Sequence, residues 1–113
     1  MSEATLYGMA HSAGVVAAES VVPKTMYVRD GETTYAVEDG VCGFAWVNIR
    51  PARGKFVSWL KKSGIGRKSY EGGYDLHIFE FGQSMTRKEE YAKAFAKVLR
   101  DNGVTAYSRS RMD

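Results

Sequence analysis

Residues 41–49 read VCGFAWVNI, and this stretch decides the fold. In a strand, side chains alternate between two faces, and both faces of this stretch are apolar. One face carries Val41, Ala45, Val47 and Ile49, and the other carries Phe44 and Trp46. A strand that is apolar on both faces is typical of the middle of a covered sheet. We therefore predict that residues 41–49 form a central strand, that Phe44 and Trp46 are buried, and that Pro51 ends the strand.

Two shorter β-rich stretches precede this strand. Residues 25–29 read TMYVR and residues 33–38 read TTYAVE, both rich in β-branched and aromatic residues. Asp30-Gly31 separates the two stretches, and Asp39-Gly40 separates the second from the central strand. Asp-Gly favours tight hairpin turns, whose central residues need positive φ. The pattern predicts a three-stranded antiparallel meander.

The remainder of the chain alternates helix and strand patterns. Residues 52–64 (ARGKFVSWLKKSG) place Phe56, Trp59 and Leu60 on one side of a short helix, and residues 74–82 (YDLHIFEFG) read as a strand. Residues 104–108 (VTAYS) read as a last strand. The resulting order predicts an α+β fold: the meander, then α-β-α-β, with the helices on one face of the sheet.

A second helix separates those last two strands. Thr86 and Glu89 have the spacing of a capping box at its start, and Asn102-Gly103 suits its C-terminus. Glu89 and Lys93 have the spacing of a favourable i,i+4 ion pair. Its apolar stripe predicts a packed helix, in which Phe95 and Leu99 are buried together with Ile78 of the preceding strand.

Residues 1–23 are rich in small residues and form an arm or a weak helix in this interpretation. Gly8 and Gly14 each disfavour a helix interior by about 1 kcal/mol relative to alanine. Pro23 closes the segment. The sequence thus predicts an N-terminal segment over 1–23 and a single α+β domain over 24–113.

Composition limits the classes of function. The single cysteine, Cys42, excludes an intramolecular disulfide and a cysteine-based zinc site, and fits a reducing compartment. No run approaches the roughly 20 apolar residues of a membrane helix, so we expect no membrane partner. With only His11 and His77 in addition, we expect neither a metal site nor a cofactor.

Positive charge is concentrated in residues 50–68, which hold seven basic residues and no acidic one. The other residues hold nine basic and thirteen acidic side chains, so the excess is local. Cations interleaved with aromatics suit a phosphate backbone or a single strand. The candidate nucleic-acid-binding residues are Arg50, Arg53, Lys55, Lys61, Lys62, Arg67, Lys68 and Tyr70. The alternative is a solvated face without a ligand.

Two further patterns bear on catalysis. Residues 63–69 (SGIGRKS) fail as a phosphate loop, because Arg67 stands where glycine must precede the lysine and a strand follows instead of a helix. Cys42 and His77 lie on two strands that we expect to be central, so a small Cys/His enzyme is a third possibility. The simpler interpretation is that Cys42 fills the core and that Asp75 satisfies His77. We predict no catalytic residue.

Residues 40–113 carry a resemblance, in DGVCGFAWVNI and in YEGGYDLHIFEFGQSMTRKEEYAKAFAKVLRDNGVTAYSRSRMD. The chain resembles small uncharacterised proteins encoded by tailed bacteriophages. The resemblance implies a viral setting, in the host cytoplasm or the virion, and transfers no catalytic residue. The leading hypothesis is a non-enzymatic binding protein for an acidic partner, most simply nucleic acid. The alternative is a structural or assembly protein of the virion with an ordered N-terminal arm, bound to copies of itself or to other virion proteins.

Overall fold

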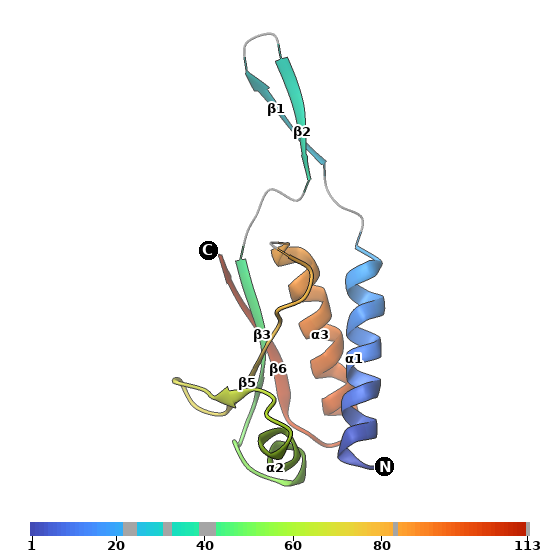
Figure 1. Cartoon of the computed structure of the whole chain (residues 1–113), viewed down its shortest axis with the longest axis vertical. Coiled ribbons are helices and arrows are strands. Elements are labelled where there is room, and N and C mark those ends of the chain that lie inside the picture. Colours follow the sequence, from blue (N-terminus) through green and yellow to red (C-terminus); the bar gives the residue numbers. More distant parts are fainter. Residues whose placement is uncertain (22–24, 31–32, 39–42, 83, 113) are drawn as a thin grey trace.

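A computed structural model describes residues 1–21, 25–30, 33–38, 43–82 and 84–112. Within these residues the helices are α1 (Glu3–Glu19), α2 (Lys55–Lys62) and α3 (Met85–Asp101). The strands are β1 (Thr25–Asp30), β2 (Thr33–Glu38), β3 (Gly43–Ile49), β4 (Arg67–Lys68), β5 (Tyr74–His77) and β6 (Ala106–Met112). The predicted α+β class is confirmed (Figure 1).

The main sheet has the strand order β4-β5-β3-β6, and each neighbouring pair is antiparallel. The central position of β3 is therefore confirmed. The predicted meander is wrong, because among the described strands β1 and β2 pair only with each other, in a separate two-stranded sheet. Both edges of β3 are taken by strands that follow it in the chain, so no edge is left for β2. The predicted α-β-α-β order also omits β4, a two-residue strand between α2 and β5.

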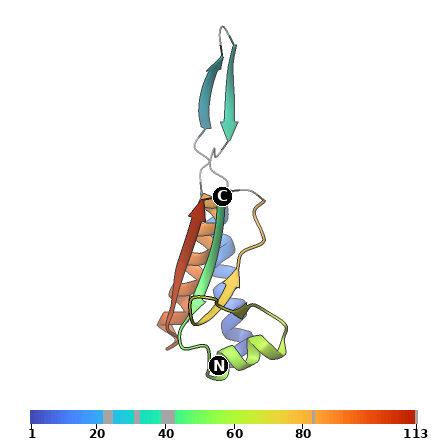
Figure 2. The same ribbon diagram turned by 90° about the vertical axis from the view of Figure 1, so that its left-hand side faces the viewer.

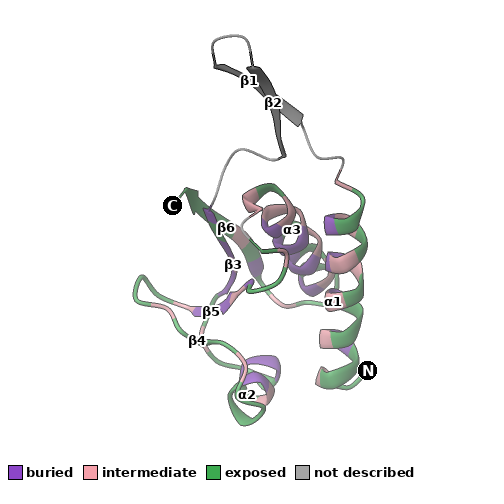
Figure 3. Ribbon diagram, turned by 45° about the horizontal axis from the view of Figure 1, so that its top comes forward, coloured by how far each residue is buried: buried purple, intermediate pink, exposed green. Residues whose placement is uncertain are grey.

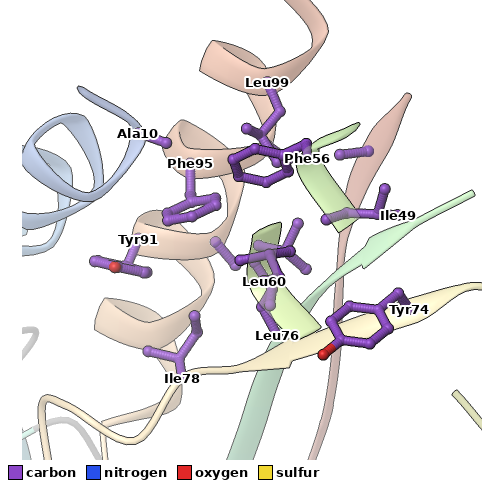
Figure 4. Close-up of a cluster of buried hydrophobic side chains, with 14 of the residues drawn as sticks. Ala10, Ile49, Phe56, Leu60, Tyr74, Leu76, Ile78, Tyr91, Phe95 and Leu99 are labelled. Carbon is purple, nitrogen blue, oxygen red and sulfur yellow. The ribbon is translucent and has the colours of Figure 1, made fainter. Parts of the chain in front are cut away.

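One face of the sheet carries the core. Ala45, Val47 and Ile49 of β3 are buried in one cluster with Phe95 and Leu99 of α3. Figure 4 shows Phe95 and Leu99 of α3 in one cluster with Ala10 of α1, Leu60 of α2 and Ile49 of β3. The predicted burial of Ile78, Phe95 and Leu99 is confirmed.

The opposite face of β3 is open to solvent in its first half, at Phe44 and Trp46, whereas Asn48 near its end is buried. Phe44 is 41% exposed and Trp46 is half-buried, so the prediction that both are buried is wrong. In Figure 2 the sheet lies in front of α1 and α3, and no described helix covers the near face. Antiparallel sheets commonly leave one face to water. The apolar residues on this face of β3 therefore need an explanation other than core packing.

The N-terminal segment forms a regular helix over most of its length. Ser2 caps α1, with its hydroxyl oxygen accepting the Thr5 N–H at 3.1 Å. The small residues of α1 allow it to pack closely along α3, as the buried Leu6 and Ala10 and the side view in Figure 1 show. A Cβ built on Gly14 would lie only 2.6 Å from the Tyr91 ring. Gly14 is therefore used for close helix packing.

The ends of α3 differ in how well they were predicted. The N-cap is Ser84, whose hydroxyl accepts the Arg87 N–H at 3.2 Å, so the predicted capping box at Thr86 is wrong. The C-cap is Asn102, and Gly103 follows with φ of 84°, as predicted. Instead of pairing with Glu89, Lys93 pairs with Glu90 at 3.3 Å.

Candidate nucleic-acid interface

The registers of the main sheet bring one set of residues together on the open face. Residues directly opposite each other in a ladder share a face. Trp46 lies opposite both His77 and Arg109, and Phe44 lies opposite Arg111. Asp75 lies opposite both Asn48 and Arg67. We call the set the sheet face: Phe44, Trp46, Asn48, Arg67, Asp75, His77, Tyr107, Arg109 and Arg111.

Aromatic rings form a row across the sheet face. Trp46 and His77 stack with ring centroids 5.4 Å apart and planes 23° apart. The Phe79 ring follows at 6.4 Å from His77 and is 85% exposed. Tyr107, at the other side of the sheet, is 59% exposed. The face thus presents aromatic rings to solvent, and most of β6 is exposed in Figure 3.

Cations lie among these rings. The Arg111 guanidinium lies over the Phe44 ring at 5.3 Å from its centroid, and the Lys88 ammonium lies 5.9 Å from the same centroid. An Arg67 guanidinium nitrogen lies 3.4 Å from His77 Nε2. Arginine held against an aromatic ring keeps its charge while its orientation is restricted.

Two carboxylates lie on or beside the sheet face, those of Glu71 and Asp75, and both already have polar partners. Glu71, in the turn between β4 and β5, forms a long ion pair of 3.9 Å with Arg109, and both side chains are largely exposed. Asp75 is buried and accepts a hydrogen bond of 2.8 Å from the Asn48 side-chain amide. The predicted contact between Asp75 and His77 is therefore replaced by one to Asn48. Exposed pairs of the Glu71–Arg109 kind contribute little stability and open readily.

The pKa of His77 is lowered below its ordinary value of 6.5, first by burial and then by the positive charge of Arg67. Arg111 acts in the same direction, and Asp75 opposes them. The imidazole is therefore neutral at pH 7. A neutral ring stacks on Trp46 without adding a further buried charge.

A groove of about 1150 Å³ borders this face. It is lined by Trp46, His77 and Arg111 and continues around β5 to Tyr7 and Tyr91 near the helices. Burial and the nearby Glu80 carboxylate raise the pKa of both tyrosines. The volume exceeds the roughly 300–1000 Å³ of pockets for small ligands, and the groove is open, so its shape suits an extended chain.

The residues predicted from the basic segment separate into two groups. Arg67 lies on the sheet face, and Arg50 and Tyr70 border it. Arg50 donates from Nε to the Asn48 side-chain oxygen at 2.9 Å and from a terminal nitrogen to the Glu71 carbonyl at 3.2 Å, which ties the β4–β5 turn down. Tyr70 is fully exposed in that turn, which projects to the side in Figure 1.

The second group lies on or beside α2 and on the other face of β4. Lys68 is opposite Tyr74 in the ladder, and the Lys61 ammonium lies 5.9 Å from the Tyr74 ring centroid. Exposed positions before and on α2 hold the remaining three residues, Arg53, Lys55 and Lys62. The eight residues therefore do not form one continuous surface.

Sequence reasoning missed Arg109 and Arg111. The predicted last strand ended at Ser108, whereas β6 continues to Met112. The signal was present, because SRSRM at 108–112 places two arginines at a spacing of two, which is one face of a strand. Phe44 and Trp46 were assigned to the core because sequence alternation does not tell which face of a sheet is covered.

Of the Cys/His pair that would make a small enzyme the third possibility, Cys42 lies outside the described residues. His77 is oriented by Trp46 and Arg67 instead of by a carboxylate. Among the described residues no group of three His, Cys, Asp or Glu side chains is placed to hold a metal ion. None of the helices in the described ranges is long and apolar enough to cross a membrane.

No protein-family model matches the chain, and no curated protein or solved structure is significantly similar to it.

Proposed function

We propose that this protein binds single-stranded nucleic acid on the sheet face, without catalysing a reaction. The observation that carries the proposal is the row of Trp46, His77 and Phe79 beside Arg67 and Arg111 on an uncovered sheet. Unpaired bases stack on aromatic rings of any type, and each stacked base contributes roughly 1–3 kcal/mol. Arginines between the rings are positioned for the phosphates that connect those bases.

The shape of the surface favours a single strand over a duplex. In a duplex the base faces are stacked on each other and are not available to aromatic side chains. Reading a duplex groove needs a helix or a two-stranded ribbon that projects into it, and the sheet face itself carries neither. The sheet face offers flat rings instead, and the open groove of about 1150 Å³ beside it is larger than a typical pocket for a small ligand.

The proposed interface differs from the one that the sequence of residues 50–68 suggested. Arg67 stays at its centre, and Arg50 and Tyr70 stay at its border. The lysines of α2 lie outside it, so they contribute long-range attraction and no stacking.

Tryptophan fluorescence tests the proposal, because the two tryptophans lie on opposite sides of the sheet. Trp46 belongs to the sheet face, while Trp59 of α2 packs against Tyr7 and Phe56. Trp59→Phe leaves Trp46 as the only indole, and Trp46→Phe is the matched control that leaves Trp59. Titration with a short oligothymidylate should quench the first variant strongly and the second hardly at all.

Two results would contradict the proposal. One is the absence of binding to single-stranded DNA or RNA at low salt. The other is equal quenching in both variants, which would locate the ligand away from the sheet face. Duplex DNA of the same length serves as the specificity control and should bind less tightly.

A second candidate function is assembly into a particle. The observation that favours it is the β1–β2 hairpin, which pairs within itself and extends beyond the main sheet in Figures 1 and 2. Electron microscopy of the concentrated protein should then show rings, tubes or filaments. A uniform population of monomers would count against it.

A further inference from the structure

The β1–β2 hairpin has little support from its own chain. Its two strands pair with each other from Thr25–Glu38 to Asp30–Thr33, and in the described residues neither makes extensive contact with another element. The long dimension of the molecule, 59 Å against 27 and 20 Å, reflects this projection. An isolated two-stranded hairpin is at best marginally stable in water. The hairpin therefore needs stabilising contacts with another molecule.

The main sheet ends in a free edge at β6. The Arg50 N–H donates to the Thr105 carbonyl at 3.1 Å, and alternate residues of an antiparallel strand bond to the same neighbour. Tyr107, Arg109 and Arg111 therefore bond to β3, while the backbone groups of Ser108, Ser110 and Met112 point away from it. No strand in the described part of the chain pairs with that side.

The start of this edge is closed by α3. The Arg100 guanidinium donates to the Ala106 carbonyl at 2.8 Å and lies over the Tyr107 ring at 5.0 Å. What remains available is the stretch from Ser108 to Met112. Exposed edges of this length attract additional strands unless charge or shape prevents it.

The charge of β6 limits which strand can pair with its free edge. The β6 sequence holds Arg109 and Arg111 and no acidic residue. Two copies of β6 would bring these arginines together, and like charges across a ladder are destabilising. Strand β2 holds one acidic residue, Glu38, and no basic residue. Strand β1 is less suitable, because Arg29 offsets Asp30 within it.

We propose that strand β2 of one copy pairs with the free edge of β6 in a second copy. The six residues of β2 are enough to cover the five-residue stretch from Ser108 to Met112, and β2, whose one charged residue is Glu38, meets a basic edge. The contact joins two different surfaces, so it propagates head to tail into a ring or a filament. The inference rests on the assembly candidate and is independent of nucleic-acid binding.

Two full-length variants test the contact, each removing one of its halves. Ser110→Pro deletes an outward-pointing N–H of β6, and proline is tolerated at an edge position of this kind. Ala36→Pro disrupts β2, which belongs to a sheet separate from the core. Ser110→Ala is the matched control, because it removes the hydroxyl and keeps the backbone donor. Near-ultraviolet circular dichroism checks that the core is intact.

Light scattering across a concentration series gives the readout. The wild-type protein and Ser110→Ala should reach at least twice the chain mass of 12.5 kDa, while each proline variant should stay at that mass. Mixing the two proline variants should restore a 1:1 complex, since one keeps an intact β6 edge and the other an intact β2. If Ser110→Pro does not fold, Arg111→Glu replaces it as the edge variant.

The alternatives give different results. A wild-type protein that is monomeric at every concentration overturns both this contact and the assembly candidate. An oligomer that survives both proline changes overturns this contact alone, and assembly then uses another surface. A mixture of the two variants that remains monomeric also overturns the proposed pairing.

Discussion

Trp46 and His77 face each other across the β3–β5 ladder, and their rings stack at 5.4 Å. The pair lies on the solvent side of the sheet, so the indole is held in place without being enclosed. A ring fixed in this way loses little conformational entropy when a base stacks on it, because its rotamer is already restricted.

The stability of the protein should fall as the pH drops below the ordinary histidine value of 6.5. The pKa of His77 is lowered by burial and then by Arg67, so in this range the unfolded chain binds more protons than the folded one. Stability rises with pH wherever that is true, and it falls on acidification. Urea unfolding at about pH 5 and about pH 8 measures the difference. His77→Gln should reduce the dependence, and an unchanged dependence would contradict the role of His77, since His11 is present in both proteins.

Salt dependence should distinguish the sheet face from the α2 surface. Arg111→Gln should flatten the log–log slope of single-strand binding by roughly 0.7, the value for one phosphate contact. Lys62→Gln on α2 removes the same charge from an exposed position outside the sheet face and should leave the slope nearly unchanged. Fluorescence titrations at several salt concentrations give both slopes. Equal flattening would return the interface to the basic segment.

Phe95→Ala should reduce the free energy of unfolding by about 3–5 kcal/mol, because it opens a cavity in the core. Phe95 is 2% exposed and contacts the rings of Tyr7 and Tyr91. Phe79→Ala is the control: it removes the same atoms from a side chain that is 85% exposed, so it should change stability by about 0.5 kcal/mol or less. Denaturant midpoints compare the two, and similar values would contradict the assignment of the core face.

Replacing Gly8 or Gly14 of α1 by alanine should change the stability of the protein in opposite directions. At Gly8 a Cβ meets nothing within 4 Å, so Gly8→Ala should stabilise the protein by up to about 1 kcal/mol through helix propensity. At Gly14 a Cβ would lie 2.6 Å from the buried Tyr91 ring, so Gly14→Ala should force α1 away from α3 and destabilise the fold. Thermal unfolding measures both shifts. A stabilising Gly14→Ala would contradict the close packing of the two helices.

Local patterns predicted much of the fold correctly. The stripe of α3, the C-cap at Asn102 and the central position of β3 all follow from periodicity and from residues near in the chain. The N-cap was misplaced because Ser84 lies only two residues before Thr86, and both residue types suit a cap. The pairing of β3 with β6 joins segments about sixty positions apart, for example Trp46 with Arg109, and no local pattern specifies it.

The site was harder to predict than the fold, for a physical reason. A row of apolar side chains has the same sequence pattern whether a helix or solvent lies above it. Phe44 and Trp46 could therefore be assigned to a face but not to its environment. Arg67 was identified by its charge, whereas Arg109 and Arg111 acquire their place beside the aromatic row only through the β3–β6 register.

Side chains of β3 point alternately to the core face and to the sheet face, so the residues on the two faces are under different selective constraints. Ala45, Val47 and Ile49 are buried in the core, while Phe44 and Trp46 contact side chains of the sheet face such as Arg111 and His77 and are otherwise open to solvent. Substitutions on the second row leave the core untouched, so they can accumulate without loss of folding. Related chains should therefore keep Ala45, Val47, Ile49 and the buried Asn48 more strictly than residues 44 and 46, and the ligand preference of such proteins should change faster than their architecture.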